Sequence, residues 1–145
     1  MTLWQYLRLL SARLLRWSLL SMVVGALMLI AEEEFLRGFG VQALVWGAVD
    51  GLIALLGWRS AGRKEAALMT WEQVSSEARK LKRILWANFG LDVLYIAGGL
   101  VLTLKIEADN PFWSGTGWGI VVQGAFLLFF DAFHAHQLNR ECVGI

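Results

Sequence analysis

Residues 84–104 read ILWANFGLDVLYIAGGLVLTL, and only a few polar side chains, chiefly Asn88 and Asp92, interrupt this apolar run. A helix needs about 20 mostly apolar residues to cross the hydrocarbon core of a bilayer. The run is therefore long enough to form a membrane span. Three other segments have a similar length and composition: residues 14–31, 38–58 and 117–136. We predict an all-α integral membrane protein in which residues 1–145 form a single domain, an antiparallel bundle of four helices.

The composition of the chain supports this class and excludes others. Of the 145 residues, 57% are hydrophobic and one is proline, which is too apolar for an ordinary soluble domain. The net charge of +1 argues against a nucleic-acid-binding protein, because such proteins carry a strong basic excess. The single cysteine can form no internal disulfide, and the spacings typical of a structural zinc site are missing. We therefore predict that the chain contacts the lipid bilayer and no nucleic acid.

Lysine and arginine residues are distributed unevenly around the predicted spans. Residues 59–83, between the second and third spans, carry seven of the 13 basic residues, and the N-terminal segment through residue 16 carries three more. The other two loops carry one each, beside five acidic residues. Basic loops of membrane proteins stay on the cytoplasmic side. We predict a multi-pass protein of the bacterial inner membrane with both termini in the cytoplasm.

The first apolar run could instead belong to a cleaved signal peptide. However, the residues before Glu32 lack the small side chain expected three positions upstream of a cleavage site, and the run is long for a signal peptide. We therefore favour a retained span.

Residues 61–83, ahead of the third span, form a predicted amphipathic cytoplasmic segment. Its apolar residues recur at steps of three and four, with charged residues between them: Ala67, Trp71, Val74, Ala78, Leu81 and, just beyond it, Leu85. Thr70 and Gln73 have the spacing of a capping box that begins a helix. No proline or glycine separates this helix from the third span, so one continuous helix is expected. It could rest on the inner membrane surface or dock a partner protein, and its basic, amphipathic composition favours the first interpretation.

Glycines predict close packing between the spans. They flank Asp50 and recur along the third and fourth spans: Gly47, Gly51, Gly90, Gly98, Gly99, Gly119 and Gly124. Small residues at helix interfaces let membrane helices approach one another closely. We expect these positions to lie at helix contacts.

Six polar side chains inside the spans are the candidate functional residues: Asp50, Asn88, Asp92, Gln123, Asp131 and His134. An ionisable group in hydrocarbon costs at least roughly 2.5–3.5 kcal/mol on insertion scales, so such groups are expected to pair, bind something or move protons. Asp50 and Asp92 each lie eight residues from the predicted inner boundary, about 12 Å at the rise of a helix. Helical spacing also pairs Asn88 with Asp92, and Asp131 with His134. We predict one cluster that opens toward the cytoplasm.

Several functions fit this cluster. Asp131 and His134 are candidate catalytic residues for acid–base chemistry on a lipid or lipid-linked substrate. Their spacing also occurs in helical-bundle metal sites, which makes Asp131, His134, Asp92 and Asp50 candidate ligands of a divalent metal. Carboxylate–histidine chains also serve proton or ion paths, which would require a homo-oligomer here. Asp50, Asn88, Asp92 and Gln123 are candidates for ligand binding or for a hydrogen-bond network.

The favoured prediction is a small inner-membrane protein whose polar cluster binds a partner or ligand, or holds the bundle together. A partner could be another membrane protein or a second copy of the chain. The sequence requires no cofactor. A membrane-embedded enzyme or an ion-conducting oligomer is the alternative.

Two stretches of the chain carry a resemblance to known proteins. They are NFGLDVLYIAG at residues 88–98 and GWGIVVQGAFLLFFDAFH at residues 117–134. Together they resemble an uncharacterised group of small bacterial four-helix membrane proteins. The resemblance implies the same architecture over the second to fourth spans and implies no activity.

Overall fold

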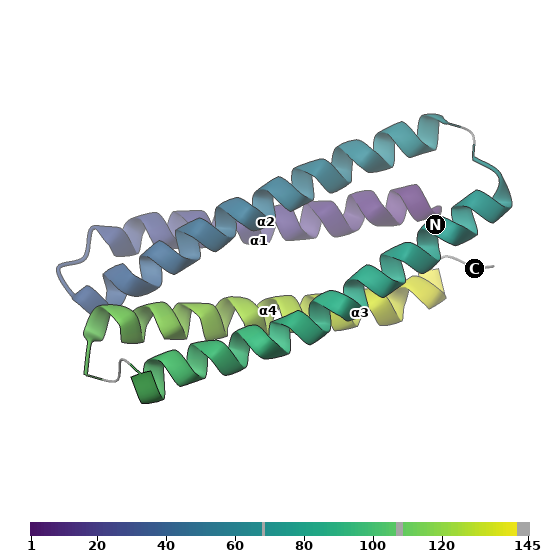
Figure 1. Cartoon of the computed structure of the whole chain (residues 1–145). Coiled ribbons are helices and arrows are strands. Elements are labelled where there is room, and N and C mark those ends of the chain that lie inside the picture. Colours follow the sequence, from purple (N-terminus) through teal and green to yellow (C-terminus); the bar gives the residue numbers. More distant parts are fainter. Residues whose placement is uncertain (68, 107–108, 142–145) are drawn as a thin grey trace.

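The computed structural model describes residues 1–67, 69–106 and 109–141, and within these ranges it contains helices and no strand (Figure 1). The helices are α1 (Leu3–Leu29), α2 (Glu34–Ala66), α3 (Trp71–Val101) and α4 (Pro111–Glu141), and a short π-helix, η1 (Leu102–Ile106), extends α3. Successive helices run in opposite directions, so α1 begins at the same end of the bundle as α4 finishes (Figure 1). The prediction of an all-α antiparallel four-helix bundle is confirmed.

All four helices are long and apolar enough to cross a membrane. Their outer surfaces carry large apolar side chains, among them Leu27, Leu94 and Phe129, each of which is more than half exposed. Such an apolar surface is unfavourable in water but favourable in contact with lipid. In lipid, the backbone N–H and C=O groups must form their hydrogen bonds within each helix, as they do here. The fold is therefore that of a multi-pass integral membrane protein.

Capping boxes begin two of the helices. Thr2 and Gln5 cap α1, and Thr70 and Gln73 cap α3, with each threonine side chain accepting a bond from the backbone N–H of the glutamine. The capping box at Thr70 confirms the predicted helix start, and α3 continues without a break into the third span, as predicted. Residues 61–83 are consequently divided between the end of α2 and the first turns of α3.

The first turns of α3 pack against protein. Ala78 is buried in a small apolar core with Leu3 and Trp4 of α1 and Leu138 of α4. Two salt bridges lie near this core. Arg8 of α1 contacts Glu65 of α2 at 2.6 Å, and Lys64 of α2 pairs with Glu77 of α3. Val74, Ala78 and Leu81 of the predicted amphipathic face therefore pack against α1 and α4, whereas Trp71 is 61% exposed. Contact of this segment with the membrane surface stays a prediction.

The bundle consists of two helical hairpins. α1 packs along α2, α3 packs along α4, and α4 also packs against α2, whereas α2 and α3 do not pack along each other in the described ranges (Figure 1). Glycines set the closest approaches within each hairpin. A Cβ atom on Gly25 would lie 2.7 Å from the carbonyl oxygen of Gly40, and one on Gly99 would lie 2.7 Å from that of Gly117.

The predicted glycine contacts are only partly formed. Gly47, Gly51, Gly99, Gly119 and Gly124 all lie against neighbouring helices. Gly90 and Gly98 have no neighbouring atom within 4 Å of an added Cβ, so the expectation of close packing at these two positions is wrong. Both lie on an exposed face of α3.

Candidate functional site

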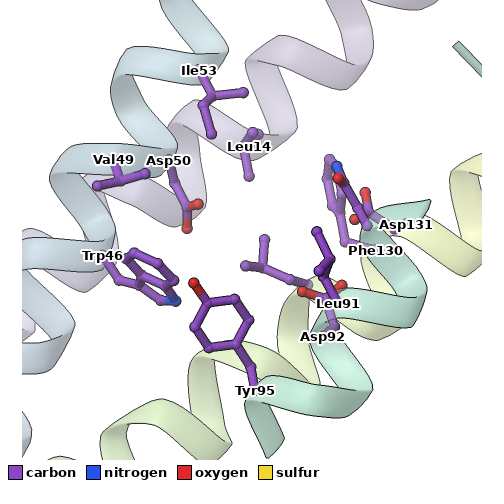
Figure 2. Close-up of a pocket in the computed structure, with 12 residues that line it drawn as sticks. Leu14, Trp46, Val49, Asp50, Ile53, Leu91, Asp92, Tyr95, Phe130 and Asp131 are labelled. Carbon is purple, nitrogen blue, oxygen red and sulfur yellow. The ribbon is translucent and has the colours of Figure 1, made fainter. Parts of the chain in front are cut away.

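A cavity of about 170 Å³ lies between α2 and α3, and α4 and α1 complete its lining (Figure 2). It exists because α2 and α3 belong to different hairpins and do not pack along each other. Its polar lining consists of Asp50, Asn88, Asp92 and Asp131, and its aromatic lining of Trp46, Tyr95 and Phe130. The remaining lining residues are aliphatic: Leu14, Val49, Ile53, Leu91 and Leu127. We call this site the acidic cleft.

Asp50 is held in the acidic cleft by the packing of α2 on α1. Its neighbours Gly47 and Gly51 lie against Ser18 of α1, and the hydroxyl of Ser18 donates a hydrogen bond to the carbonyl of Gly47 at 2.7 Å. This contact fixes the rotation of α2, so that Asp50 points into the space between α2 and α3 (Figure 2). Only 4% of Asp50 is exposed.

On the other side of the cleft, Asp131 connects α4 with α3. The side chains of Asn88 and Asp92 line the cleft together with Asp131 and interact electrostatically with it. Asn88 and Asp92 are one helical turn apart, which places both on the face of α3 that meets α4. Two neighbouring ionised carboxylates would repel each other, so the Asp92–Asp131 pair favours protonation of one carboxyl group or a cation beside them.

Several buried polar atoms of the acidic cleft have no hydrogen-bond partner on the protein among the described residues. They are Oδ2 of Asp50, Oδ2 of Asp92 and Nε1 of Trp46. Leaving such a group unsatisfied costs about 1–3 kcal/mol, and more when the group is charged. In a folded protein such groups are usually explained by an ordered water or ion, a ligand, local strain or a catalytic role. The unpartnered carboxylate oxygens therefore make the acidic cleft a candidate functional site.

Aromatic rings line the cleft beside its carboxyl groups. Trp46 and Tyr95 meet edge to face across the gap between α2 and α3, with ring centroids 5.1 Å apart, and Tyr95 points toward Asp50 (Figure 2). Phe130 of α4 completes the aromatic lining. Aromatic faces attract cations through the ring quadrupole, so their presence beside carboxylates gives the cleft two kinds of cation-attracting group.

His134 does not belong to the acidic cleft. Its Nδ1 lies 2.9 Å from the hydroxyl of Tyr6 in α1, and this hydroxyl donates to the backbone carbonyl of His134, also at 2.9 Å. The hydroxyl has one proton, so when it donates to the carbonyl, the contact with Nδ1 requires the tautomer in which Nδ1 carries the ring proton. No hydrogen bond links His134 to Asp131 among the described residues, so the predicted acid–base pair is not assembled.

Gln123 also faces α1. Its Oε1 accepts a hydrogen bond from Nε1 of Trp17 at 2.9 Å, and its Nε2 donates to the hydroxyl of Ser21 at 3.0 Å. These bonds join α4 to α1, away from the acidic cleft. We call the contacts of Gln123 and His134 with α1 the α1–α4 seam.

The candidate metal ligands do not converge. In the part of the chain that the structure describes, no group of three or more His, Cys, Asp or Glu side chains is placed to hold a metal ion. The set predicted from spacing, Asp50, Asp92, Asp131 and His134, is broken because the His134 ring is bonded to Tyr6. The geometry does not support the hypothesis of a divalent-metal site.

The sequence patterns missed several residues of these sites. Trp46 and Tyr95 lie within one turn of Asp50 and Asp92, so helical spacing could have placed them beside the carboxylates. Tyr6 gave no such signal, since its partner His134 is 128 positions away in the sequence.

Comparison with known proteins gives one match. Residues 13–132 match the Family of unknown function (DUF6992), a range that includes all four polar residues of the acidic cleft. No curated protein and no solved structure gave a match. The match agrees with the resemblance to an uncharacterised group that has no established activity. Because it covers most of the chain, this protein belongs to the DUF6992 family.

Proposed function

We propose that this protein is a small ligand-binding protein of the bacterial inner membrane. Its ligand carries a positively charged nitrogen, which binds in the acidic cleft, and an apolar body, which remains in contact with lipid. The observation that carries the proposal is the pair of buried, unpartnered carboxylate oxygens of Asp50 and Asp92, contributed by two helices that face each other across a cavity.

The charge of the lining supports a cationic ligand. Three carboxyl groups line the acidic cleft, and no lysine, arginine or histidine lines it. A buried carboxylate is stable only when it is paired, hydrogen-bonded or protonated. An ammonium group between Asp50 and the Asp92–Asp131 pair would place its positive charge beside both, and Trp46 and Tyr95 would contact its alkyl substituents.

The size of the acidic cleft supports a ligand that enters only in part. The cavity of about 170 Å³ is smaller than the roughly 300–1,000 Å³ typical of pockets that enclose a drug-sized molecule. Its aliphatic lining residues Val49, Ile53 and Leu91 are exposed on the lipid-facing surface. The ligand would therefore place its ammonium group inside and leave its apolar body between α2 and α3.

The arrangement of the seam residues supports two separate roles within the predicted cluster, one structural and one in ligand binding. Gln123 and His134 have hydrogen-bond partners on α1 and serve to hold the bundle together. The cleft carboxylates serve the ligand. The distribution of lysine and arginine supports an orientation with both termini in the cytoplasm, which places the acidic cleft in the inner half of the membrane.

Proton transfer is a second candidate function of the same cleft. The closeness of Asp92 and Asp131 favours it, because two carboxyl groups that share a proton can pass it on. In sealed vesicles that contain a pH-sensitive dye, this function predicts proton flux that Asp131→Asn abolishes. A ligand-binding protein without proton transfer predicts no flux above that of empty vesicles.

Binding of octyltrimethylammonium to the purified protein in an uncharged detergent tests the proposal. Since truncating one partner of a buried charge pair costs about 2–5 kcal/mol, Asp50→Asn should weaken binding at least about tenfold. The matched control, Asp109→Asn, removes a carboxylate outside the cleft and should leave binding unchanged. Because the probe also enters the micelle, all proteins are compared at equal detergent. Equal affinity of wild type and Asp50→Asn, or equally tight binding of octanol, would overturn the proposal.

A further inference from the structure

A second groove lies on the other side of Phe130, between α1 and α4. Its volume is about 450 Å³, within the range of sites that hold a large part of a ligand. Two basic residues and a tryptophan from α1 and three phenylalanines from α4 provide most of its lining: Arg13, Arg16, Trp17, Phe126, Phe130 and Phe133. We call it the basic groove. No aspartate or glutamate lines it.

Within the part of the chain that the structure describes, the two arginines of the basic groove form no salt bridge. The salt bridges within the described residues join Arg8 to Glu65, and Lys64 and Lys80 to Glu77, and none involves Arg13 or Arg16. Arg13 lies over the ring of Phe133, with its guanidinium carbon 6.0 Å from the ring centroid. The two arginines are three residues apart on one helix, so both guanidinium groups can approach a single anion from adjacent turns.

The apolar part of the basic groove is built around an aromatic contact between α1 and α4. Trp17 and Phe126 stack face to face, with ring centroids 3.7 Å apart and planes 6° apart, and both rings line the groove. Trp17 is held in place by its hydrogen bond to Gln123. The exposed side chain of Leu20 lies one turn deeper along α1 and continues the apolar lining.

We propose that the basic groove binds an anionic phospholipid. The phosphate would pair with Arg13 and Arg16, and an acyl chain would lie along Trp17, Phe126 and Leu20. Trp17 lies at the predicted inner boundary of the first span, which is the depth of headgroups, and basic pockets at this depth suit anionic headgroups. Such a lipid would bridge the α1–α4 seam. This inference goes beyond the proposed function of the acidic cleft and does not rest on it.

The test compares lipids and variants on the full chain. The wild type, purified in detergent, is mixed with phosphatidylcholine alone, with phosphatidylcholine plus phosphatidylglycerol, or with inorganic phosphate, and its melting temperature is measured. Phosphatidylglycerol should raise the melting temperature, and the other two additions should not. An equal rise with phosphatidylcholine would overturn the proposal, and a full rise with inorganic phosphate would assign the arginines to a free anion and overturn the lipid assignment.

Two charge-matched variants separate the groove from general attraction to basic surface. Arg13→Gln/Arg16→Gln should weaken phosphatidylglycerol binding by about tenfold or more, since both guanidinium groups that attract the anionic headgroup are lost. Arg59→Gln/Arg63→Gln removes the same charge from exposed positions at the end of α2 and should behave as wild type. Equal loss in both variants would overturn the proposal.

A further measurement remains decisive if the groove variant does not fold. Native mass spectrometry of the wild type should show one phosphatidylglycerol retained per chain in preference to phosphatidylcholine. Equal retention of the two lipids would overturn the proposal.

Discussion

The acidic cleft and the α1–α4 seam both contain buried polar side chains, but the two regions differ in whether these side chains have hydrogen-bond partners. In the seam, His134 is 1% exposed and both Gln123 and Tyr6 use their donors and acceptors on neighbouring helices. In the acidic cleft, Asp50 is 4% exposed and its Oδ2 has no partner. Burial is therefore similar in the two regions, and the satisfaction of hydrogen bonds is what distinguishes them.

The difference predicts opposite responses to substitution. Hydrogen bonds between membrane helices contribute about 0.6 kcal/mol each and rarely more than 1.7, so seam residues should stabilise the fold. An orphaned polar atom costs free energy, so its removal should leave stability unchanged or raise it. Residues retained at a cost to stability are typical of functional sites.

The largest expected effect follows from Gln123→Leu. This change removes both bonds of the amide and leaves Nε1 of Trp17 and the hydroxyl of Ser21 without their partner. The free energy of unfolding should fall by about 1–3 kcal/mol. Reversible unfolding in mixed micelles measures it, with lipid-facing Val122→Leu as the control. Stability equal to that of the control would contradict the structural role of the seam.

Tyr6→Phe should have the next largest effect. The ring remains in its apolar core, and only the hydroxyl that contacts the ring and the carbonyl of His134 is lost. The expected loss of stability is about 0.6–1.7 kcal/mol. Binding of octyltrimethylammonium should not change, because Tyr6 is remote from the acidic cleft. A variant as stable as wild type but deficient in binding would show that this tyrosine serves the ligand.

Asp50→Asn should give a smaller effect of opposite sign. Oδ2 has no partner to lose, and the amide of asparagine removes the cost of burying a charge while keeping the shape, so stability without ligand should be unchanged or higher by up to about 1 kcal/mol. The same unfolding assay measures it, and Asp109→Asn is the matched control. Destabilisation comparable to that of Gln123→Leu would assign Asp50 to the scaffold.

The smallest expected effect is the coupling free energy between a substitution in the seam and one in the cleft. Gln123 and Asp50 share no hydrogen-bond partner, so the effects of Gln123→Leu and Asp50→Asn should add within about 0.5 kcal/mol. A double-mutant cycle in the unfolding assay measures this. Coupling of more than about 1 kcal/mol would mean that the seam and the cleft form one network.

The sequence predicted the architecture well because its signals are local. Apolar runs of sufficient length marked the four spans. The Thr70–Gln73 capping box, with no proline or glycine between it and the third span, predicted a continuous α3. The shared depth of Asp50 and Asp92 followed from counting residues, and the acidic cleft does contain both.

The composition of the site was harder to predict because it depends on helix rotation. At about 100° per residue, His134 and Gln123 are displaced from Asp131 by about 60° and 80° to the same side of α4, and from each other by only about 20°. That rotation directs both toward α1 and leaves Asp131 facing α3. Spacing along one helix identified neighbours on α4, but the assignment of each neighbour to a partner helix required the packing of the whole bundle.

The division into two hairpins bears on how the chain enters the membrane. Each hairpin holds its own tight glycine contact, Gly25 with Gly40 and Gly99 with Gly117. We expect each to insert as a closed pair during synthesis and to dock through α2 and α4 afterwards, in keeping with association of helices that are already inserted. Asp50 belongs to the first pair, and Asp92 and Asp131 to the second.

The acidic cleft is therefore a product of this last docking step. Two separately expressed halves, residues 1–67 and 68–145, should each reach the membrane but bind no octyltrimethylammonium alone, and co-expression should restore binding. Binding by either half alone would contradict this order of assembly. The binding site would then form only when assembly of the whole bundle is complete. A partly assembled protein would not bring all three carboxyl groups together and so would not bind cations at this site.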